Sequence, residues 1–198
     1  MNALDQTLFS AINAGSLDWG ATAWVAYAAA RYIVLLIPLH VAILWIAGTH
    51  DVRRQALALV AALVIAIGIS FLIGAVVPSQ RPFLIPIGNQ LIEHRASPSF
   101  PSNHGLVMFT YAAVMLSLRH WRHAACIGCA SVFVAWSRVY LGIHFPLDMV
   151  GALVVAVVAA WGARAFDRRF GLEVTRRVEA MFDRTVVRPA NWMIRKQG

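Results

Sequence analysis

The feature that most constrains this chain is a series of apolar runs, each close to the length that a helix needs to cross a lipid bilayer. About 20 helical residues span the roughly 30 Å of hydrocarbon in a membrane. Hydrophobic residues make up 60% of the 198 residues and charged residues 13%, a mixture that a water-soluble domain of this size would not keep off its surface. Five such runs occur, at about residues 32–47, 55–77, 105–118, 124–140 and 145–163.

These runs predict an all-α fold, a polytopic membrane helix bundle. A further apolar stretch, residues 19–30, is short, so it is either a sixth span that runs almost directly into the next or an interfacial element. We expect six transmembrane helices, with five as the alternative. The first residues place apolar side chains at helical spacing, which predicts an N-terminal amphipathic helix lying on the membrane. These side chains are Leu4, Leu8, Phe9 and Ile12.

Positive charge gathers in three places. Lys and Arg number 17 against 9 Asp and Glu, a net charge of +8. Thirteen of the 17 lie at residues 53–54, 119–122 and 164–196, and counting spans puts all three places on one side. The positive-inside rule makes that side cytoplasmic, so we infer no nucleic-acid partner. We expect one domain over residues 1–198 in a bacterial cytoplasmic (inner) membrane, with a basic cytoplasmic tail at about 165–198.

Polar residues gather at the opposite, extracytoplasmic face in three segments that are far apart in sequence. These are "PSQRPF" at residues 78–83, "SFPSNH" at 99–104 and "SRVYLGIHFPLD" at 137–148. Ionisable groups in or beside a membrane span are costly unless a partner or a ligand balances them. We therefore expect the three segments to form one composite pocket that holds a phosphate.

The segment "SFPSNH" comes directly before an apolar helix. Pro101 favours a helix start just after it. The backbone N–H groups of Ser102, Asn103 and His104 would then be free at a helix N-terminus, where an anion such as phosphate is stabilised. The alternative for Ser102 is that it only caps the helix.

His144 and Asp148 are four residues apart at the start of the last span. They therefore share one helix face, where the carboxylate can orient and polarise the imidazole. Such a pair activates a histidine as a nucleophile or a base. Arg81 and Arg138 add two guanidinium groups whose forked donors match phosphate oxygens. With His104 on the same membrane side, these residues predict a functional site.

The pattern resembles the type 2 phosphatidic acid phosphatase (PAP2) superfamily of integral membrane lipid phosphatases. That family carries three signatures: Lys, six residues, then Arg-Pro; Pro-Ser-Gly-His; and Ser-Arg, five residues, His, three residues, Asp. The layout is most similar to the bacitracin-resistance type of undecaprenyl-diphosphatase. In chain order the matching residues are Arg81 and Pro82; Pro101, Ser102 and His104; and Ser137, Arg138, His144 and Asp148.

Two positions depart from the family pattern. The family lysine would fall at Gly74, so one phosphate-binding cation is missing from its usual place. The nearest candidates to replace it as headgroup contacts are Arg95 and His94. Asn103 stands where the family has glycine, and asparagine tolerates unusual backbone conformations better than most residues.

The resemblance implies a hydrolase that needs no metal and no other cofactor. His144, set up by Asp148, would attack the terminal phosphorus and form a phosphohistidine. His104 would protonate the leaving lipid phosphate and later activate water. The substrate would be undecaprenyl diphosphate and the product undecaprenyl phosphate, the lipid carrier for cell-wall building blocks. The implied phosphate-binding groups are Arg81, Arg138, Ser102 and the Asn103 amide.

The sequence leaves alternatives open. The core signatures fit other lipid phosphates equally well, including phosphatidylglycerol phosphate, phosphatidate and lipid A. A non-catalytic protein that binds or transports an anionic lipid is a second class. A haem or metal protein is disfavoured, because His104 and His144 lie beside arginines that would repel a cation. The oligomeric state is open.

Overall fold

The computed structural model describes residues 3–187, and every regular secondary-structure element within that range is a helix. This confirms the all-α prediction. Six α-helices follow the N-terminal helix, which is the number expected. The α-helices are α1 (Ala3–Ile12), α2 (Ala21–Tyr32), α3 (Leu36–Ala47), α4 (His50–Val76), α5 (Asn103–Ser117), α6 (Trp121–Tyr140) and α7 (Pro146–Phe182). Shorter turns are η1 (Ile33–Leu35), η2 (Pro82–Leu84) and the π-helical η3 (Asp183–Val187).

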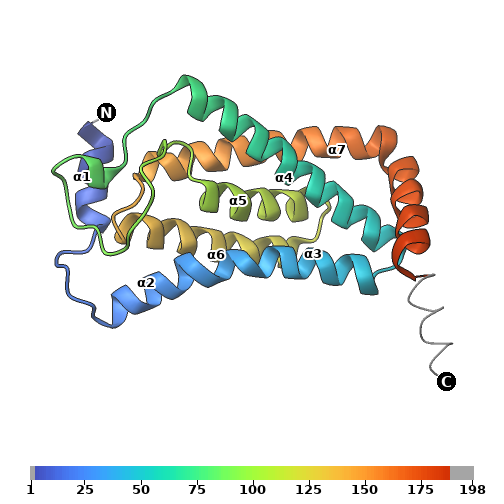
Figure 1. The fold of residues 1–198 in the computed structure, drawn as a ribbon, viewed down its shortest axis with the longest axis horizontal. Coiled ribbons are helices and arrows are strands. Elements are labelled where there is room, and N and C mark those ends of the chain that lie inside the picture. Colours follow the sequence, from blue (N-terminus) through green and yellow to red (C-terminus); the bar gives the residue numbers. More distant parts are fainter. Residues whose placement is uncertain (1–2, 188–198) are drawn as a thin grey trace.

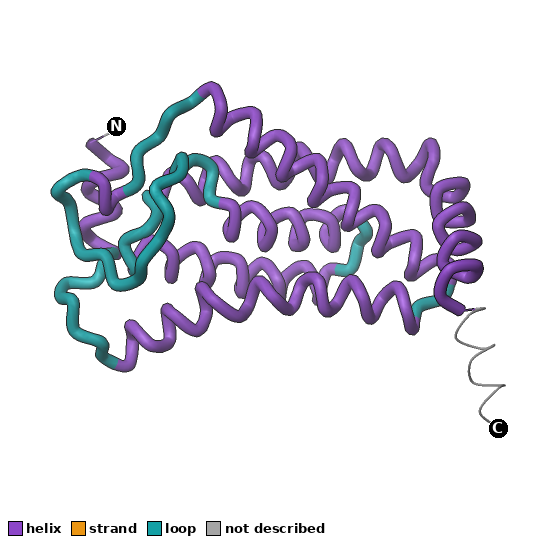
Figure 2. Tube along the Cα trace, viewed as in Figure 1, coloured by secondary structure: helices purple, strands orange, loops and turns teal. Residues whose placement is uncertain are grey.

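The long helices run side by side as a bundle (Figures 1 and 2). α2 and α3 continue through η1 as one rod, so the two apolar stretches near the N-terminus lie end to end. α5 packs against α4, α6 and α7 and so forms the centre of the bundle. Three segments are long and apolar enough to cross a membrane, and they are Ala21–Ala47, His50–Val76 and Pro146–Val187.

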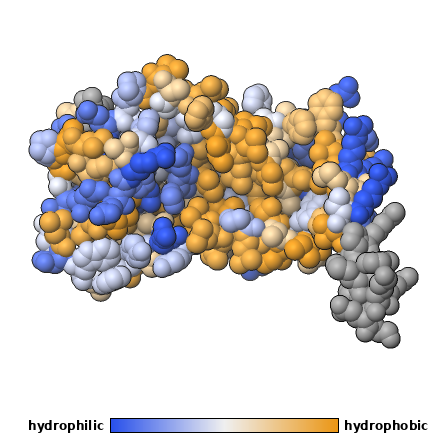
Figure 3. Space-filling model, viewed as in Figure 1, coloured by the Kyte–Doolittle hydropathy of each residue, from blue (hydrophilic) through white to orange (hydrophobic). Residues whose placement is uncertain are grey.

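The outside of the bundle is apolar where a soluble protein would be polar. Figure 3 shows a broad hydrophobic zone around the middle of the molecule, with hydrophilic residues toward both ends. Phe71 on α4 is 76% exposed and Trp161 on α7 is 78% exposed. An apolar surface of this extent is suited to contact with lipid, because hydrocarbon cannot form hydrogen bonds with polar groups. The chain is a membrane protein.

The two ends of the bundle differ in what they carry. The loop between α4 and α5 (residues 77–102) and the turn between α6 and α7 lie at the same end as α1 (Figure 1). The α3–α4 and α5–α6 connections and the end of α7 lie at the other end, so the described basic clusters share it, as counting spans predicted. Residues 164–182 belong to α7 and residues 183–187 form η3. The last part of the predicted tail lies outside the described residues.

Helix α1 forms as predicted and docks on the end of the bundle. Phe9 is fully buried, and its ring lies 5.2 Å from that of Phe145. Asp5 accepts a hydrogen bond from the backbone N–H of Leu147 at 2.9 Å, which satisfies a donor in the first turn of α7. Leu4 remains 57% exposed. The helix is therefore amphipathic, but its buried face meets protein.

Candidate active site

The turn between α6 and α7 positions the central histidine. Gly142 has φ +79°, a conformation that disfavours other residues. A Cβ at this position would lie 2.1 Å from the carbonyl oxygen of Asn89. Pro146 then starts α7, its fixed φ being suited to the first helical residue. The turn consequently places His144 directly before the helix and Asp148 in its first turn.

The Asp148 carboxylate gathers three hydrogen-bond donors on one oxygen. Its Oδ2 accepts from His144 Nδ1 at 3.1 Å and from the backbone N–H of Phe145 at 2.8 Å. It also accepts from the hydroxyl of Ser99 at 2.5 Å. Because the carboxylate accepts from Nδ1, the proton of the neutral imidazole lies on Nδ1. His144 Nε2 therefore carries the lone pair.

Burial keeps the imidazole of His144 neutral. The side chain is 2% exposed. Burial lowers the pKa of His144 to about 4, although the hydrogen bond and the charge of Asp148 act in the opposite direction. At neutral pH the Nε2 lone pair is therefore available to an electrophile.

Arg81 holds the loop against this turn. Its NH1 group donates to the carbonyl of Ile143 at 3.0 Å and lies 3.1 Å from His144 Nε2. Nε and NH2 donate to three oxygens of Ser97 and Pro98. All five N–H donors of the guanidinium are thus engaged. A phosphate oxygen would therefore bind Arg81 by replacing its contact with His144. That contact joins the guanidinium to the Nε2 lone pair of His144.

Arg138 is buried with an unmet donor. It projects from the last turn of α6 and is 4% exposed. One NH2 proton meets His94 Nε2 at 3.1 Å, but Nε has no hydrogen-bond partner within the described residues. The ring of His94 lies 6.2 Å from that of His144. Because a buried unpaired donor is costly, this guanidinium is suited to receive an anion.

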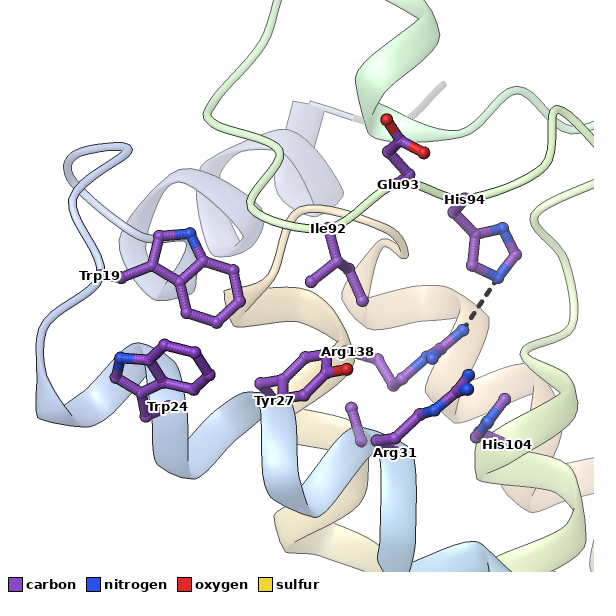
Figure 4. A pocket seen from close by; sticks show the side chains of 10 residues that line it. Trp19, Trp24, Tyr27, Arg31, Ile92, Glu93, His94, His104 and Arg138 are labelled. Carbon is purple, nitrogen blue, oxygen red and sulfur yellow. Dashed lines mark hydrogen bonds between the residues drawn. The ribbon is translucent and has the colours of Figure 1, made fainter.

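A cavity of about 560 Å³ opens beside Arg138. Figure 4 shows Arg138 from α6 and His104 from the first turn of α5 facing it, with His94 on the loop above. Residues from α2 and the preceding segment close its other side. The complete lining is Trp19, Trp24, Tyr27, Ala30, Arg31, Ile92, Glu93, His94, His104 and Arg138.

The N-terminus of α5 differs in part from what the sequence predicts. The Ser102 hydroxyl accepts from the N–H of Gly105 at 3.4 Å, so this side chain is a cap, as the alternative interpretation held. The prediction that the Ser102 N–H is free was wrong, because this group donates to the carbonyl of Asp148 at 3.2 Å. Asn103 and His104 supply the first-turn N–H groups that an α-helix leaves without intrahelical partners.

Asn103 and Arg95 lie on a different side of the site. The Asn103 side chain is exposed, and its oxygen accepts from the hydroxyl of Ser70 on α4 at 3.1 Å. Asn103 and Arg95 line a second hollow of about 410 Å³, which Gly74 also lines. Of the two candidates for the missing cation, His94 faces the cavity of His104, whereas Arg95 faces the hollow beside Gly74.

The charge at this end comes from guanidinium groups. Within residues 3–187, no cluster of three or more histidine, cysteine, aspartate or glutamate side chains is arranged to hold a metal ion. One oxygen of the Asp148 carboxylate, Oδ2, already accepts from three hydrogen-bond donors. The donor set is thus built to stabilise negative charge, as phosphoryl transfer requires.

Two residues of this region escaped the sequence analysis. Ser99 is fully buried against both His144 and Asp148, yet in the sequence it is one serine among several in a loop. Arg31 lines the cavity from α2, although it precedes all three signature segments. Its signal was helical spacing, because Trp24, Tyr27 and Arg31 recur at intervals of three and four and so share one face.

The chain is similar to several known proteins. The family model described as the PAP2 superfamily matches residues 55–171. YbjG of Escherichia coli (strain K12) is 33% identical over 181 residues, 90% of each chain. The undecaprenyl-diphosphatase BcrC of Bacillus subtilis (strain 168) is 27% identical over 168 residues, which cover 83% of this chain and 84% of BcrC.

Two solved structures share the fold. Aquifex aeolicus LpxE superposes with a TM-score of 0.67 and 21% identity, over 83% of this chain and 96% of that one. A PAP2-type phosphatidylglycerolphosphate phosphatase from Bacillus subtilis gives a TM-score of 0.66 and 22% identity, over 85% and 88%. At these identities the likeness concerns the fold alone.

Proposed function

The chain belongs to the PAP2 superfamily of membrane lipid phosphatases, and on that premise we propose that it hydrolyses undecaprenyl diphosphate to undecaprenyl phosphate and inorganic phosphate. Support for this substrate comes from a relative named undecaprenyl-diphosphatase, to which the chain is similar over most of the length of both proteins. The proposal places the reaction at the end of the bundle that carries His144.

One observation carries the reaction type. Asp148 binds Nδ1 of His144, so Nε2 points away from the carboxylate and toward the guanidinium of Arg81, 3.1 Å away. A phosphate that displaced this contact would meet the lone pair on one side and a fixed positive charge on the other. Such an arrangement favours nucleophilic attack at phosphorus.

The proposed chemistry proceeds in two steps. Nε2 of His144 forms a bond to the terminal phosphorus as the bond to the bridging oxygen breaks, and His104 donates its proton to that oxygen. Water then attacks the phosphohistidine and gives its proton to His104, and the P–N bond breaks to release inorganic phosphate. Arg81, Arg138 and the first N–H groups of α5 would stabilise the charge on the transferred group.

We expect this activity to need no divalent metal, because guanidinium groups supply the positive charge. Purified protein in detergent with excess EDTA should release inorganic phosphate from undecaprenyl diphosphate. A His144→Ala preparation purified in parallel measures contaminating phosphatases. Abolition by EDTA with rescue by magnesium would refute the metal-independent mechanism. Faster release from phosphatidate, phosphatidylglycerol phosphate or lipid A than from the diphosphate would refute the proposed substrate.

The proposal also assigns sides of the membrane, with the site facing outward and the basic end facing the cytoplasm. We expect a cysteine at Ala96, in the exposed part of the long loop, to react with an impermeant thiol reagent in intact cells. A cysteine at Arg122, at the other end, should react only after the cells are permeabilised. Both are placed in a chain whose Cys126 and Cys129 are alanine, since both native thiols are exposed. The reverse pattern would invert the orientation.

A further inference from the structure

We infer that Arg31 binds the second phosphate of a diphosphate substrate, the one that stays on the lipid, and so sets the preference for a diphosphate over a monophosphate. This inference rests on the proposed function and adds to it a residue outside the three family signatures. The evidence comes from the cavity lining, from charge and from the order of the groups along the cavity.

Arg31 lies on the side of α2 that faces the cavity. It is ten residues after Ala21, the first residue of the 27-residue rod Ala21–Ala47, which places it about 15 Å along the helix axis. The residue is exposed and lines the cavity, and Figure 4 shows its side chain extending from α2 toward His104 and Arg138.

Positive charge also enters the cavity from two different helices. Arg31 and Arg138 enter it from α2 and α6, and Arg138 keeps a buried Nε without a partner in the described part of the chain. Two guanidinium groups facing one space repel each other unless an anion lies between them. Glu93 is at the rim, and its carboxylate points away from both in Figure 4. A bound anion would balance this charge.

The position of the cavity identifies which phosphate this is. His104, the proposed proton donor to the leaving group, lines the cavity, whereas His144 and Arg81 are not among its lining residues. The transferred phosphate would sit at His144, so the phosphate retained by the lipid would enter the space that His104 shares with Arg31. There a guanidinium would stabilise the charge that develops on the leaving group.

An aromatic wall continues from this space toward the surface. The rings of Trp19 and Trp24 lie 4.6 Å apart, and Tyr27 lies 5.7 Å from Trp19. Aromatic rings at the membrane interface present an apolar body and a polar tip. They would hold the first units of a polyprenyl chain directly beyond the phosphate. Charge and apolar surface thus follow each other in the order of a polyprenyl diphosphate.

The test compares two substrates with the same tail, farnesyl diphosphate and farnesyl monophosphate. In Arg31→Gln, the ratio of kcat/KM for the diphosphate to that for the monophosphate should fall about 10- to 100-fold, the loss of a charged hydrogen bond. Arg31→Lys should recover part of this ratio. Arg122→Gln removes the same charge at the far end of the bundle and should leave the ratio unchanged.

The outcomes separate the two proposals. An equal fall for both substrates, or no fall, would overturn the role of Arg31 while leaving the diphosphatase proposal intact. A wild-type protein that cleaves the monophosphate but not the diphosphate would overturn both. Melting temperatures of the variants in detergent, if equal to that of the wild type, exclude a loss of fold as the cause of a changed ratio.

Discussion

Replacement of His144 by alanine is expected to abolish turnover of every substrate, whereas replacement of His104 should spare substrates whose leaving group needs no proton. The difference follows from their proposed roles. His144 would form the bond to phosphorus, because Asp148 binds its Nδ1 while the Nε2 lone pair lies beside the guanidinium of Arg81. His104 would donate a proton, which contributes about 10²- to 10⁴-fold for a poor leaving group and little for a good one.

p-Nitrophenyl phosphate separates the two roles, because nitrophenolate leaves without protonation. The His104→Ala variant should release a burst of nitrophenolate close to one equivalent per active site, followed by slow turnover, because hydrolysis of the phosphohistidine lacks its base. The His144→Ala variant should give no burst. The measurement is rapid-mixing absorbance of nitrophenolate against enzyme concentration. A burst from His144→Ala with none from His104→Ala would reverse the assignment.

Asp148→Asn is expected to lower kcat by about 10³-fold with little change in KM, because the carboxylate acts through His144. Asp148 Oδ2 accepts from three donors, and the carboxylate charge stabilises the imidazole as it becomes cationic. An amide keeps one acceptor and loses the charge. Steady-state kinetics over several substrate concentrations separate kcat from KM. A rise in KM at constant kcat would instead make Asp148 part of substrate binding.

Ser99→Ala provides a graded companion to this variant. It removes one of the three donors and leaves the His144 and Phe145 contacts in place, so we expect a fall of about tenfold in kcat. Ser117→Ala, which removes a hydroxyl bonded only within the far end of α5, is the matched control. In the Asp148→Asn background, Ser99→Ala should cost little more, since both act on one network. Full additivity of the two losses would contradict this.

Much of the fold was predictable because membrane helices are specified locally. In lipid each helix must satisfy its own backbone hydrogen bonds, so a run of apolar residues is enough to define it. The charges at residues 53–54 and 119–122 identify one end of the bundle, because each pair lies between two apolar runs and therefore at a connection between helices. The sequence left open whether residues 19–30 form a separate span, because hydropathy does not show whether two apolar stretches belong to one continuous helical segment.

The pairing of His144 with Asp148 was likewise predictable, since four residues of one helix start suffice to bring them together. The contact between Arg81 and His144 was expected only as shared membership of a pocket. The structure shows in addition that the other N–H donors of Arg81 already bind Ser97, Pro98 and Ile143. A sequence lists the donors of a side chain but not which of them are already used.

The sequence by itself thus determined the helices, and it predicted the candidate site residues and the proposed direction across the membrane, because all of these predictions depend on local spacing and on hydropathy. The tertiary structure decided the rest. It turned Asn103 toward α4, used the Ser102 N–H on Asp148, buried Ser99 beside the histidine, and directed Arg31 into the cavity. These outcomes depend on how α2, α4 and the loop at 77–102 pack around α5, and packing between distant segments leaves no periodic trace in a single sequence.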